Sequence, residues 1–286
     1  MNTLEMLQKK EKFSTSEALL ADFILENKEK VLSMSVQDLA KSSYTSTSSV
    51  VRMCKKMGLD GYQSFKIQLA TDLQKSDDDF AIKIDPNFPF SKNDCYFEYS
   101  KKIYNLCKEA LTDTYKKCSA HDFEKSVQLL EKSEKCCIVA IGDSYLRCLD
   151  FQNKMMKINE TILMSTIPGE IGHLANTMTP KDCAIVVSYS GNTNETAGYA
   201  EILKRKHCPF ILITSRPNSR IAKMASVVLC VTDRESQSIK FSTFASQIGI
   251  EFVLNNLYAY FFIRNYDKNT TQRLETEMDF INTRSD

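Results

Sequence analysis

The feature that most constrains the fold of this 286-residue chain is a series of short apolar segments that begins at Cys136. Five such segments follow one another, at 136–141, 162–165, 184–187, 210–213 and 227–231. Segments with helical periodicity separate most of them. Continuous apolar strands that alternate with helices indicate a parallel sheet covered by helices on both faces. The sequence therefore predicts a five-stranded parallel α/β domain, followed by a long apolar helix or helix pair over 237–263.

A different pattern fills the first 75 residues, where apolar side chains recur at helical spacing. Ser14 and Glu17 have the spacing of a capping box, and a similar signal begins at Ser35. An acidic run at 77–79 and two later prolines are typical of a linker. We therefore expect three parts, namely an all-α domain over 1–76, a linker over 77–93, and the α/β domain with its preceding and terminal helices over 94–286.

Charge and composition exclude several classes of protein. The net charge is +1, so any nucleic-acid surface must be a local basic patch. No apolar run reaches the roughly 18 residues of a membrane helix, and the polar N-terminus lacks the apolar core of a signal peptide, so we expect a cytoplasmic protein without membrane contact. The ten cysteines form no Cys-x-x-Cys pair and only three histidines are present. We therefore expect reduced, buried thiols, with no metal site and no cofactor.

Two turns rich in hydroxyl groups follow predicted strands. They are Gly142-Asp143-Ser144 and Ser188-Tyr189-Ser190-Gly191-Asn192-Thr193. Ligands of open parallel sheets bind beyond the carboxyl ends of the strands, so we expect both turns to line one site. Gly191 permits a tight turn, and the backbone N–H groups of 190–193 lead into a helix N-terminus, which favours an anion. The plain alternative is a strand-to-helix connection with a good cap.

The 188–193 turn resembles the Ser-x-Ser-Gly-x-Thr signature of SIS (sugar isomerase) domains. Gly142-Asp143-Ser144 and the pair Asn218-Ser219 are similar to further recurring motifs of that family. The resemblance extends over about 136–260 and implies a flavodoxin-like five-stranded sheet, dimerisation and a phosphorylated sugar as ligand. It also implies that four hydroxyl groups hold the phosphate, those of Ser144, Ser188, Ser190 and Thr193.

Asp143 departs from this pattern, because the family usually has a small neutral residue at that position. A carboxylate repels a nearby phosphate, so Asp143 either points away from the phosphate or meets a sugar hydroxyl or amine. The residues alone leave both arrangements open.

Residues 36–55 have the spacing of a helix-turn-helix. Leu39 and Ala40 on its first helix, with Val50 and Met53 on its second, stand at core-facing positions. Ser46 is placed to cap the second helix. We expect the outward face of that helix to present five side chains, those of Thr47, Ser48, Ser49, Arg52 and Lys56.

The basic charge of this half is concentrated around the second helix. Between Lys41 and Lys66 there are five cations and one anion, whereas residues 1–40 carry five cations and seven anions. Binding to a nucleic-acid phosphate backbone requires such a concentration of cations. An ordinary solvated helix face is the alternative.

The same segment resembles the N-terminal domain of RpiR-type regulators over about 15–74. The matching residues are Leu39-Ala40, Thr45-Ser46, the run 50–58, Gly61-Tyr62 and Lys66. These regulators join this domain to a SIS domain in the same order. Tyr44 departs from the glycine usual in the turn, at a cost of about 1–2 kcal/mol if its backbone is left-handed. Thr45 also replaces a residue that is usually apolar.

Together the two resemblances imply a DNA-binding transcriptional regulator. Its SIS domain would bind a phosphorylated sugar that modulates operator binding and the expression of carbohydrate metabolism genes. The expected partners are double-stranded operator DNA, the sugar phosphate, and further copies of the chain in a homodimer or tetramer. The competing hypothesis is a phosphosugar isomerase or lyase, which needs a general base such as Glu170, His173 or Glu195. We expect no enzyme, because an isomerase does not need a DNA-binding half.

Two sets of site residues follow from these arguments. We predict that the effector contacts Gly142, Ser144, Ser188, Tyr189, Ser190, Gly191, Asn192 and Thr193, and on the terminal helix Thr243 and Gln247. We predict that DNA contacts Ser46, Thr47, Ser48, Ser49, Arg52, Lys55, Lys56 and Lys66.

Overall fold

The computed structural model describes residues 3–78, 84–236 and 239–282. The chain forms two compact units, Met1–Lys83 and Ile84–Asp286. The predicted linker over 77–93 is thus divided between them. Its later part belongs to the second unit, where Phe241 meets Phe88 edge to face and stacks on Phe90, at ring-centroid distances of 4.9 and 5.4 Å.

The first unit contains only helices among its described residues. They are α1 (Thr3–Lys9), α2 (Thr15–Glu26), α3 (Lys28–Ser33), α4 (Val36–Ser42), α5 (Thr47–Lys56) and α6 (Tyr62–Asp78). The predicted core residues Leu39, Val50 and Met53 are fully buried, and Ala40 is nearly so. They pack with Leu20, Phe65 and other apolar side chains into one cluster.

Local sequence signals set the ends of these helices. The predicted capping boxes at Ser14 and Ser35 are both present. The side chain of Ser46 accepts a hydrogen bond from the Ser49 backbone N–H at the start of α5. After α5, Gly58 has a φ of 78°, a left-handed conformation that costs glycine little. Helices α4 and α5, joined by a short turn, form the predicted helix-turn-helix.

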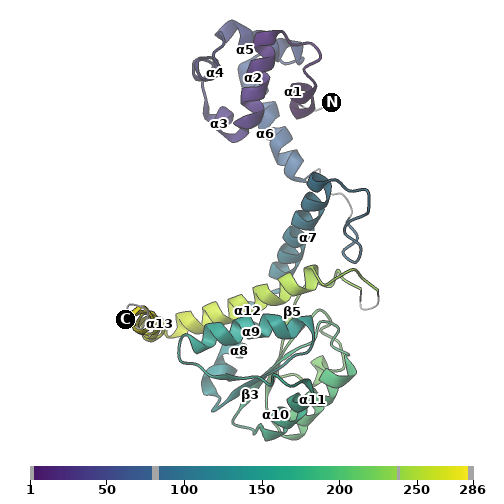
Figure 1. Ribbon diagram of the computed structural model, residues 1–286, viewed down its shortest axis with the longest axis vertical. Coiled ribbons are helices and arrows are strands. Elements are labelled where there is room, and N and C mark those ends of the chain that lie inside the picture. The colour runs from purple at the N-terminus through teal and green to yellow at the C-terminus, as the bar shows by residue number, and fades with distance from the viewer. Residues whose placement is uncertain (1–2, 79–83, 237–238, 283–286) are drawn as a thin grey trace. The chain divides into compact units, whose positions relative to one another are not determined.

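The second unit contains a five-stranded sheet whose strands are all parallel. The strand order is β2-β1-β3-β4-β5. Figure 1 shows this sheet, with β3 and β5 labelled. The strands are β1 (Cys136–Val139), β2 (Ile162–Leu163), β3 (Cys183–Val187), β4 (Phe210–Thr214) and β5 (Val227–Cys230). Each lies within or close to a predicted apolar segment, so the predicted fold class is confirmed.

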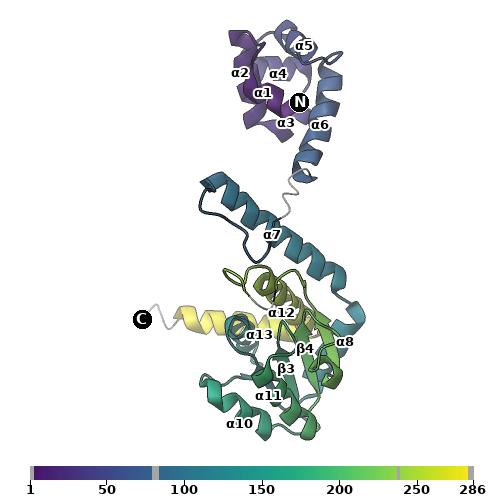
Figure 2. The ribbon, with the colours of Figure 1, turned by 90° about the vertical axis from the view of Figure 1, so that its right-hand side faces the viewer.

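Helices cover both faces of the sheet (Figure 2). One face packs against α8 (Ala120–Lys132), α9 (Asp143–Met156) and α12 (Ala245–Arg264) through a cluster that includes Phe151 and Leu257. The other face packs against α10 (Ile171–Thr177) and α11 (Asn194–Arg205). Helix α7 (Tyr96–Lys117) packs against α12 and is the first helix of the second unit. The unit also contains two short 3₁₀ turns, η1 (Pro168–Glu170) and η2 (Ala222–Met224).

The terminal helices differ from the sequence prediction. Helix α12 begins at Ala245, so the prediction of a helix from 237 was wrong for 239–244, and 237–238 lie outside the described residues. The apolar residues of this segment are used in a loop instead, because Phe241 packs on Phe88 and its backbone N–H bonds the Asn87 carbonyl.

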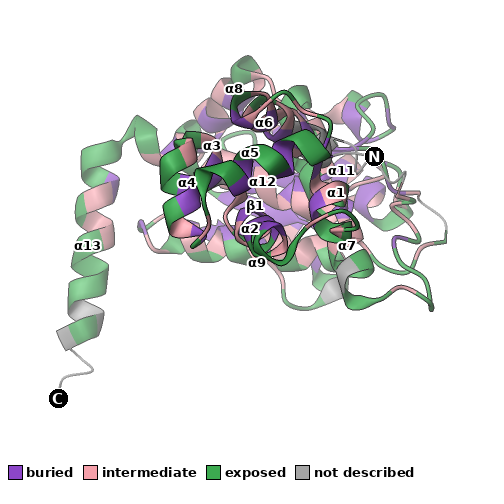
Figure 3. Ribbon diagram, turned by 90° about the horizontal axis from the view of Figure 1, so that it is seen from above, coloured by how far each residue is buried: buried purple, intermediate pink, exposed green. Residues whose placement is uncertain are grey.

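A further helix, α13 (Tyr266–Asn282), was not predicted. It is largely exposed (Figure 3). Leu274 and Met278 on this helix are exposed. No helix within the described part of the chain is both long and apolar enough to cross a membrane.

Candidate functional site

A cavity of about 310 Å³ opens at the carboxyl ends of β1 and β3, and we refer to it as the loop cavity. It is lined by Ile141, Ser144, Val187, Ser188, Tyr189, Ser190, Asn192, Thr193, Thr196 and Lys240. Six of the predicted effector residues are therefore brought together there. The two hydroxyl-rich turns meet because parallel β1 and β3 are neighbours in the sheet and end at the same edge.

Two hydroxyl groups of the loop cavity have no hydrogen-bond partner among the described residues. They are the Oγ of Ser188 and the Oγ1 of Thr196, whose residues are only 4% and 1% exposed. An unpaired buried hydroxyl costs about 1–3 kcal/mol, so proteins seldom retain one without a use. Both groups are suited to donate a hydrogen bond to an acceptor that enters the cavity.

The start of α11 adds further donors. Thr193 stands at the N-cap, but its hydroxyl does not cap the helix and lies 3.2 Å from the Oγ of Ser190. The first N–H groups of a helix have no intrahelical partner, and the helix dipole favours an anion there. Two of the N–H groups expected to face an anion are used inside the loop, because Gly191 bonds the Ser188 carbonyl and Asn192 bonds the Ser190 Oγ.

The conformation of the loop depends on Gly191. Its φ is 63°, and a Cβ at this position would lie 2.1 Å from the Oγ of Ser219. Gly191 is therefore required both by its backbone and by the close packing of the loop over the exit of β4. Asn192 fixes the same contact, since its Oδ1 accepts a hydrogen bond from the Arg220 backbone N–H. This contact explains the Asn218-Ser219 motif, whose serine packs beneath the loop.

Lys240 is the cation among the residues that line the loop cavity, and it was not predicted from the sequence. Its Nζ lies 5.6 Å from the centre of the Tyr189 ring and donates to the carboxylate of Glu235 at 3.0 Å. Glu235 is buried and also accepts hydrogen bonds from the backbone N–H and hydroxyl of Ser246. Burial raises the pKa of Tyr189 to about 12, so its ring remains neutral beside these charges. The available sequence signal was that Lys240 is the only cation between Arg234 and Arg264.

Four predicted effector residues lie outside the lining of the loop cavity. Gly142 lines a neighbouring cavity of about 220 Å³, and Gly191 is buried within its turn. Gln247 lies on α12, and its Oε1 is buried without a partner among the described residues. Thr243 donates its hydroxyl to Asp143. This bond occupies the Asp143 carboxylate, and Asp143 does not line the loop cavity, in agreement with the arrangement in which it points away.

A larger cavity of about 650 Å³ lies beside the loop cavity and shares Asn192 with it. Its lining includes Lys117, Arg216, Asn218 and Asp233. Two hydroxyl groups that lack a partner among the described residues, the N-terminus of α11 and Lys240 converge on the loop cavity, and this arrangement favours an anion there. The larger one offers space for the remainder of a ligand.

None of the residues considered as a general base lines the loop cavity. Glu195 is exposed in the first turn of α11, where a carboxylate is favourable on electrostatic grounds alone. Glu170 ends η1 and is exposed, and His173 is exposed on α10.

In the first unit, the second helix of the helix-turn-helix presents several predicted DNA-binding side chains. Ser46, Thr47, Ser48, Arg52 and Lys55 are exposed. Ser49 is 5% exposed, so the prediction that it faces outward was wrong. Because it stands one helical turn before the core residue Met53, it faces inward. Its hydroxyl accepts a hydrogen bond from the Arg52 guanidinium, which makes it a positioning residue.

The two remaining lysines are already engaged within the unit. The Nζ of Lys56 lies 2.6 Å from the carboxylate of Glu17, and Glu17 is 1% exposed. The Nζ of Lys66 donates to the Met34 carbonyl at 3.3 Å. Tyr44 has a φ of 53° and is almost fully exposed, so the turn keeps its left-handed residue without a glycine.

Comparison with known proteins agrees with the division of the chain into a helical unit and a unit that contains the sheet. Residues 1–76 match the helix-turn-helix domain of the rpiR family, and residues 129–250 match the SIS domain. An uncharacterised HTH-type transcriptional regulator of Thermotoga maritima is 25% identical over 260 residues, covering 90% of this chain and 91% of the relative.

Two solved structures share the fold. The Vibrio vulnificus NanR protein, complexed with ManNAc-6P, has a TM-score of 0.60 at 23% identity and covers 99% of each chain. A putative phosphosugar isomerase from Bacteroides fragilis, involved in capsule formation, has a TM-score of 0.54 at 16% identity. It covers 62% of this chain and 97% of its own. With both domains matched in this order and a regulator matched over nearly its whole length, the chain belongs to the RpiR-type transcriptional regulators, which carry an N-terminal helix-turn-helix and a C-terminal SIS domain.

Proposed function

We propose that this regulator binds a phosphorylated sugar in the loop cavity, and that occupancy of the cavity modulates its binding to operator DNA upstream of carbohydrate metabolism genes. The observation that supports the proposal most strongly is the pair of buried hydroxyl groups of Ser188 and Thr196 beside Lys240, which have no hydrogen-bond partner in the part of the chain that the structure describes. A phosphate accepts hydrogen bonds through several oxygens, so it satisfies both hydroxyls and the cation at once. The NanR structure, which holds a sugar phosphate on the same fold, is consistent with this ligand class.

The sugar end of the ligand extends toward the cavity that shares Asn192. A combined space of this size suits a small ligand whose orientation is fixed by a few polar groups. Operator recognition then falls to α5, whose exposed Arg52 and Lys55 meet the DNA backbone while Thr47 and Ser48 reach base edges. We further propose that the chain acts as a homodimer, because paired recognition helices match half-sites one turn apart.

Binding of a ligand to the folded state raises the unfolding midpoint by mass action, so a thermal-shift panel tests the ligand class. The panel contains hexose phosphates, phosphorylated amino sugars and sugar acids, the matching unphosphorylated sugars, and inorganic phosphate. We expect stabilisation by the compounds that carry a phosphate group, and none by the matching unphosphorylated sugars. Equal stabilisation by an unphosphorylated sugar contradicts the assignment.

Replacement of Ser190 by alanine tests the site itself. We expect the affinity for the best sugar phosphate to fall about tenfold or more, which corresponds to about 1.4 kcal/mol. Ser133→Ala is the matched control, because Ser133 lies just before β1, at the amino ends of the strands and away from the loop cavity. Its hydroxyl bonds the Leu130 carbonyl. Unchanged affinity in Ser190→Ala, or an equal loss in both variants, excludes the loop as the phosphate site.

The salt dependence of operator binding tests the DNA interface. Arg52→Ala should reduce the slope of log K against log salt by about 0.9, the value for one lost phosphate contact. Lys30→Ala removes an exposed cation from α3, outside the recognition helix, and should leave the slope unchanged. An Arg52→Ala slope equal to that of the wild type places the DNA contacts elsewhere.

An isomerase or lyase in the same cavity is the competing function. It is disfavoured because Glu170, His173 and Glu195 all lie outside the cavity lining. We expect no turnover of the stabilising sugar phosphate over hours of incubation. Turnover that Glu195→Gln abolishes would overturn the preference for a regulator.

A further inference from the structure

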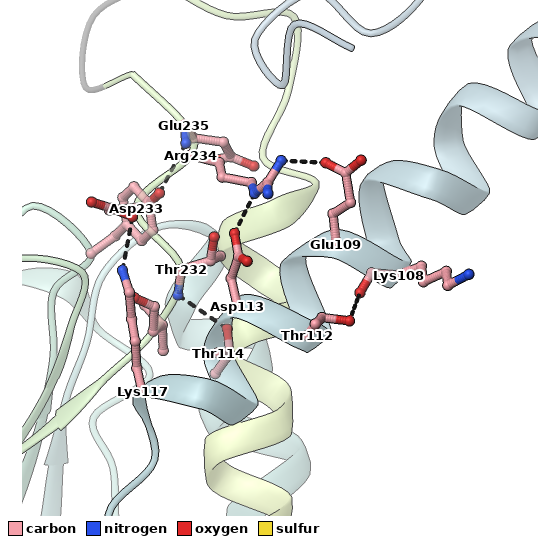
Figure 4. A network of polar contacts seen from close by, with 12 residues as sticks. Lys108, Glu109, Thr112, Asp113, Thr114, Lys117, Thr232, Asp233, Arg234 and Glu235 are labelled. Atoms are coloured by element: carbon pink, nitrogen blue, oxygen red, sulfur yellow. Dashed lines mark hydrogen bonds and ion pairs between the residues drawn. The ribbon is translucent and has the colours of Figure 1, made fainter. Parts of the chain in front are cut away.

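Four consecutive residues, 232–235, lie between the loop cavity and α7, and Figure 4 shows their contacts with α7. They directly follow Val231 at the end of β5, and we refer to them as the strap. Because the strap is short, its members cannot move independently of one another. Its first three residues bond α7, and its fourth bonds groups of the loop cavity and α12.

On the α7 side, the strap makes contacts over two turns of the helix. The Arg234 guanidinium forms ion pairs with both Glu109 and Asp113, which stand four residues apart on one face of α7. Asp233 pairs with Lys117 at 2.8 Å. The Thr232 backbone N–H donates to the hydroxyl of Thr114, which is fully buried, at 3.0 Å.

On the cavity side, the contacts converge on Glu235. Its backbone N–H donates to the hydroxyl of Tyr189, a residue of the 188–193 turn, at 3.1 Å. Its buried carboxylate holds Lys240 at 3.0 Å and the hydroxyl of Ser246 at 2.7 Å. Two of the residues that line the loop cavity, Tyr189 and Lys240, are therefore bonded directly to the strap.

We infer that the strap transmits occupancy of the loop cavity to α7, and that Arg234 is the residue that couples the two. The inference rests on the proposed function, since it requires a phosphate ligand in the cavity. The proposed function names the residues that bind the ligand, and the inference adds the contact that carries the response to α7.

The physical reason lies in the charge balance around Lys240. An ammonium has three donors, and a phosphate in the cavity draws Lys240 toward itself. The buried carboxylate of Glu235 must then follow Lys240 or lose its cation, and a buried carboxylate tolerates such a loss poorly. Since Glu235 adjoins Arg234, its displacement is passed to Glu109 and Asp113.

Helix α7 is a suitable receiver of this displacement. Along the chain it is the first α-helix after the segment that joins the two units, so its position sets where that segment ends. Arginine suits the coupling role because its planar fork contacts two carboxylates at fixed geometry, whereas lysine is a single point charge. Helix α7 also contacts α12 directly, and those contacts are largely packing contacts, such as that of Gly249 against Thr114.

The experiment compares Arg234→Gln with the wild type in the full-length protein. The probes are inorganic phosphate and the sugar phosphate that raises the unfolding midpoint most. Effector binding is measured by calorimetry, and operator binding by fluorescence anisotropy with and without each probe. The measured quantity is the ratio of the two operator affinities, which for typical allosteric coupling is about 5–150.

We expect Arg234→Gln to bind the sugar phosphate within about threefold of the wild type, while its operator-affinity ratio falls to within about twofold of one. Arg264→Gln is the matched control, because it breaks an arginine–carboxylate pair with Glu131, between α12 and α8, away from the strap. The control should retain the wild-type ratio. A wild-type ratio in Arg234→Gln overturns the inference, and so does an equal loss in both variants.

A second variant covers the case in which Arg234→Gln does not fold. Glu109→Gln with Asp113→Asn removes the same ion pairs from the α7 side and should lower the ratio equally. Exchange of the charges in Arg234→Asp with Asp113→Arg should restore at least part of it. If the wild type binds no phosphorylated compound, or binds one without a change in operator affinity, the proposed function itself fails. If the wild type responds and the variants respond equally, only the strap is excluded.

Discussion

Lys56 on the helix expected to contact DNA forms an ion pair with buried Glu17 on α2, with 2.6 Å between its Nζ and the Glu17 Oε2. This lysine therefore has a role inside the helical unit as well as at its surface. Burial raises the pKa of Glu17, but hydrogen bonds from Lys56 and Ser14 outweigh burial and hold that pKa below its usual value.

The first prediction concerns the stability of the helical unit. Lys56→Met should destabilise it by about 1–3 kcal/mol, because a buried carboxylate loses its charged partner. Lys55→Met, one position away and exposed, is the control and should change stability little. Urea unfolding at neutral pH followed by circular dichroism measures both. Equal stability of the two variants contradicts a structural role for the pair.

The pH dependence of this effect has a definite sign. Because the pKa of Glu17 is lower in the folded than in the unfolded state, its contribution to stability is present above the unfolded value of about 4.3 and is lost as pH falls through the folded value. The difference between wild type and Lys56→Met should therefore shrink below about pH 4. A difference that persists unchanged in acid assigns the effect to packing of the lysine stem instead.

The second prediction separates the two roles of Lys240. Lys240→Met should weaken sugar-phosphate binding by about tenfold or more, and it should also destabilise the domain, because the buried carboxylate of Glu235 loses its cation. The double variant Lys240→Met with Glu235→Gln should recover stability without recovering affinity. Calorimetry and thermal unfolding measure the two effects. Recovery of affinity in the double variant shows that Lys240 does not contact the ligand.

The third prediction concerns the packing of Gly191 over Ser219. Gly191→Ala should lower the unfolding midpoint and weaken ligand binding, since the backbone conformation costs about 1–2 kcal/mol and the new Cβ collides with Ser219. Adding Ser219→Gly should remove the collision and leave only the backbone cost. Gly198→Ala within α11 is the control, because a Cβ there meets nothing within 4 Å. If Gly191→Ala behaves like Gly198→Ala, the loop does not require this conformation.

The fourth prediction concerns the cysteines, all ten of which are free. Six are buried, and Cys95 alone among the ten is exposed. Burial raises the pKa of Cys148 to about 12 and that of Cys54 to about 11, which suppresses the reactive thiolate. Iodoacetamide at pH 8 should therefore alkylate Cys95 first, as mass spectrometry would detect. Cys95→Ser should lose this first modification, and rapid alkylation of Cys148 in the native protein would contradict the buried assignment.

The strands and the helix-turn-helix were predictable because their signals are local. Each strand is a continuous apolar run that ends in a turn residue, and the caps at Ser14, Ser35 and Ser46 follow directly from short-range hydrogen bonding. Helical spacing also identified Val50 and Met53 as core residues, although the same spacing should have placed Ser49 inside with them.

The parts that failed depend on tertiary contacts. The segment around Phe241 has the apolar content of a helix, but it is a loop because Phe88 and Phe90 provide a surface for its aromatic ring. Lys240 was missed for a similar reason, since its position is set by Glu235 and Tyr189, and the pairing of these residues has no local signature.

The compactness of the strap has a consequence for how such regulators diverge. Residues 232–235 bond α7 and the ligand-binding loop in strict succession, so a single inserted or deleted residue there would shift every later side chain out of phase with its partners. Such a change would displace Glu235 from Tyr189 and Lys240 as well as Arg234 from α7, so the contacts on both sides of the strap would be lost together. The spacing of four residues thus ties the evolution of the cavity to that of α7, because neither set of contacts tolerates a change of length in the strap without the other.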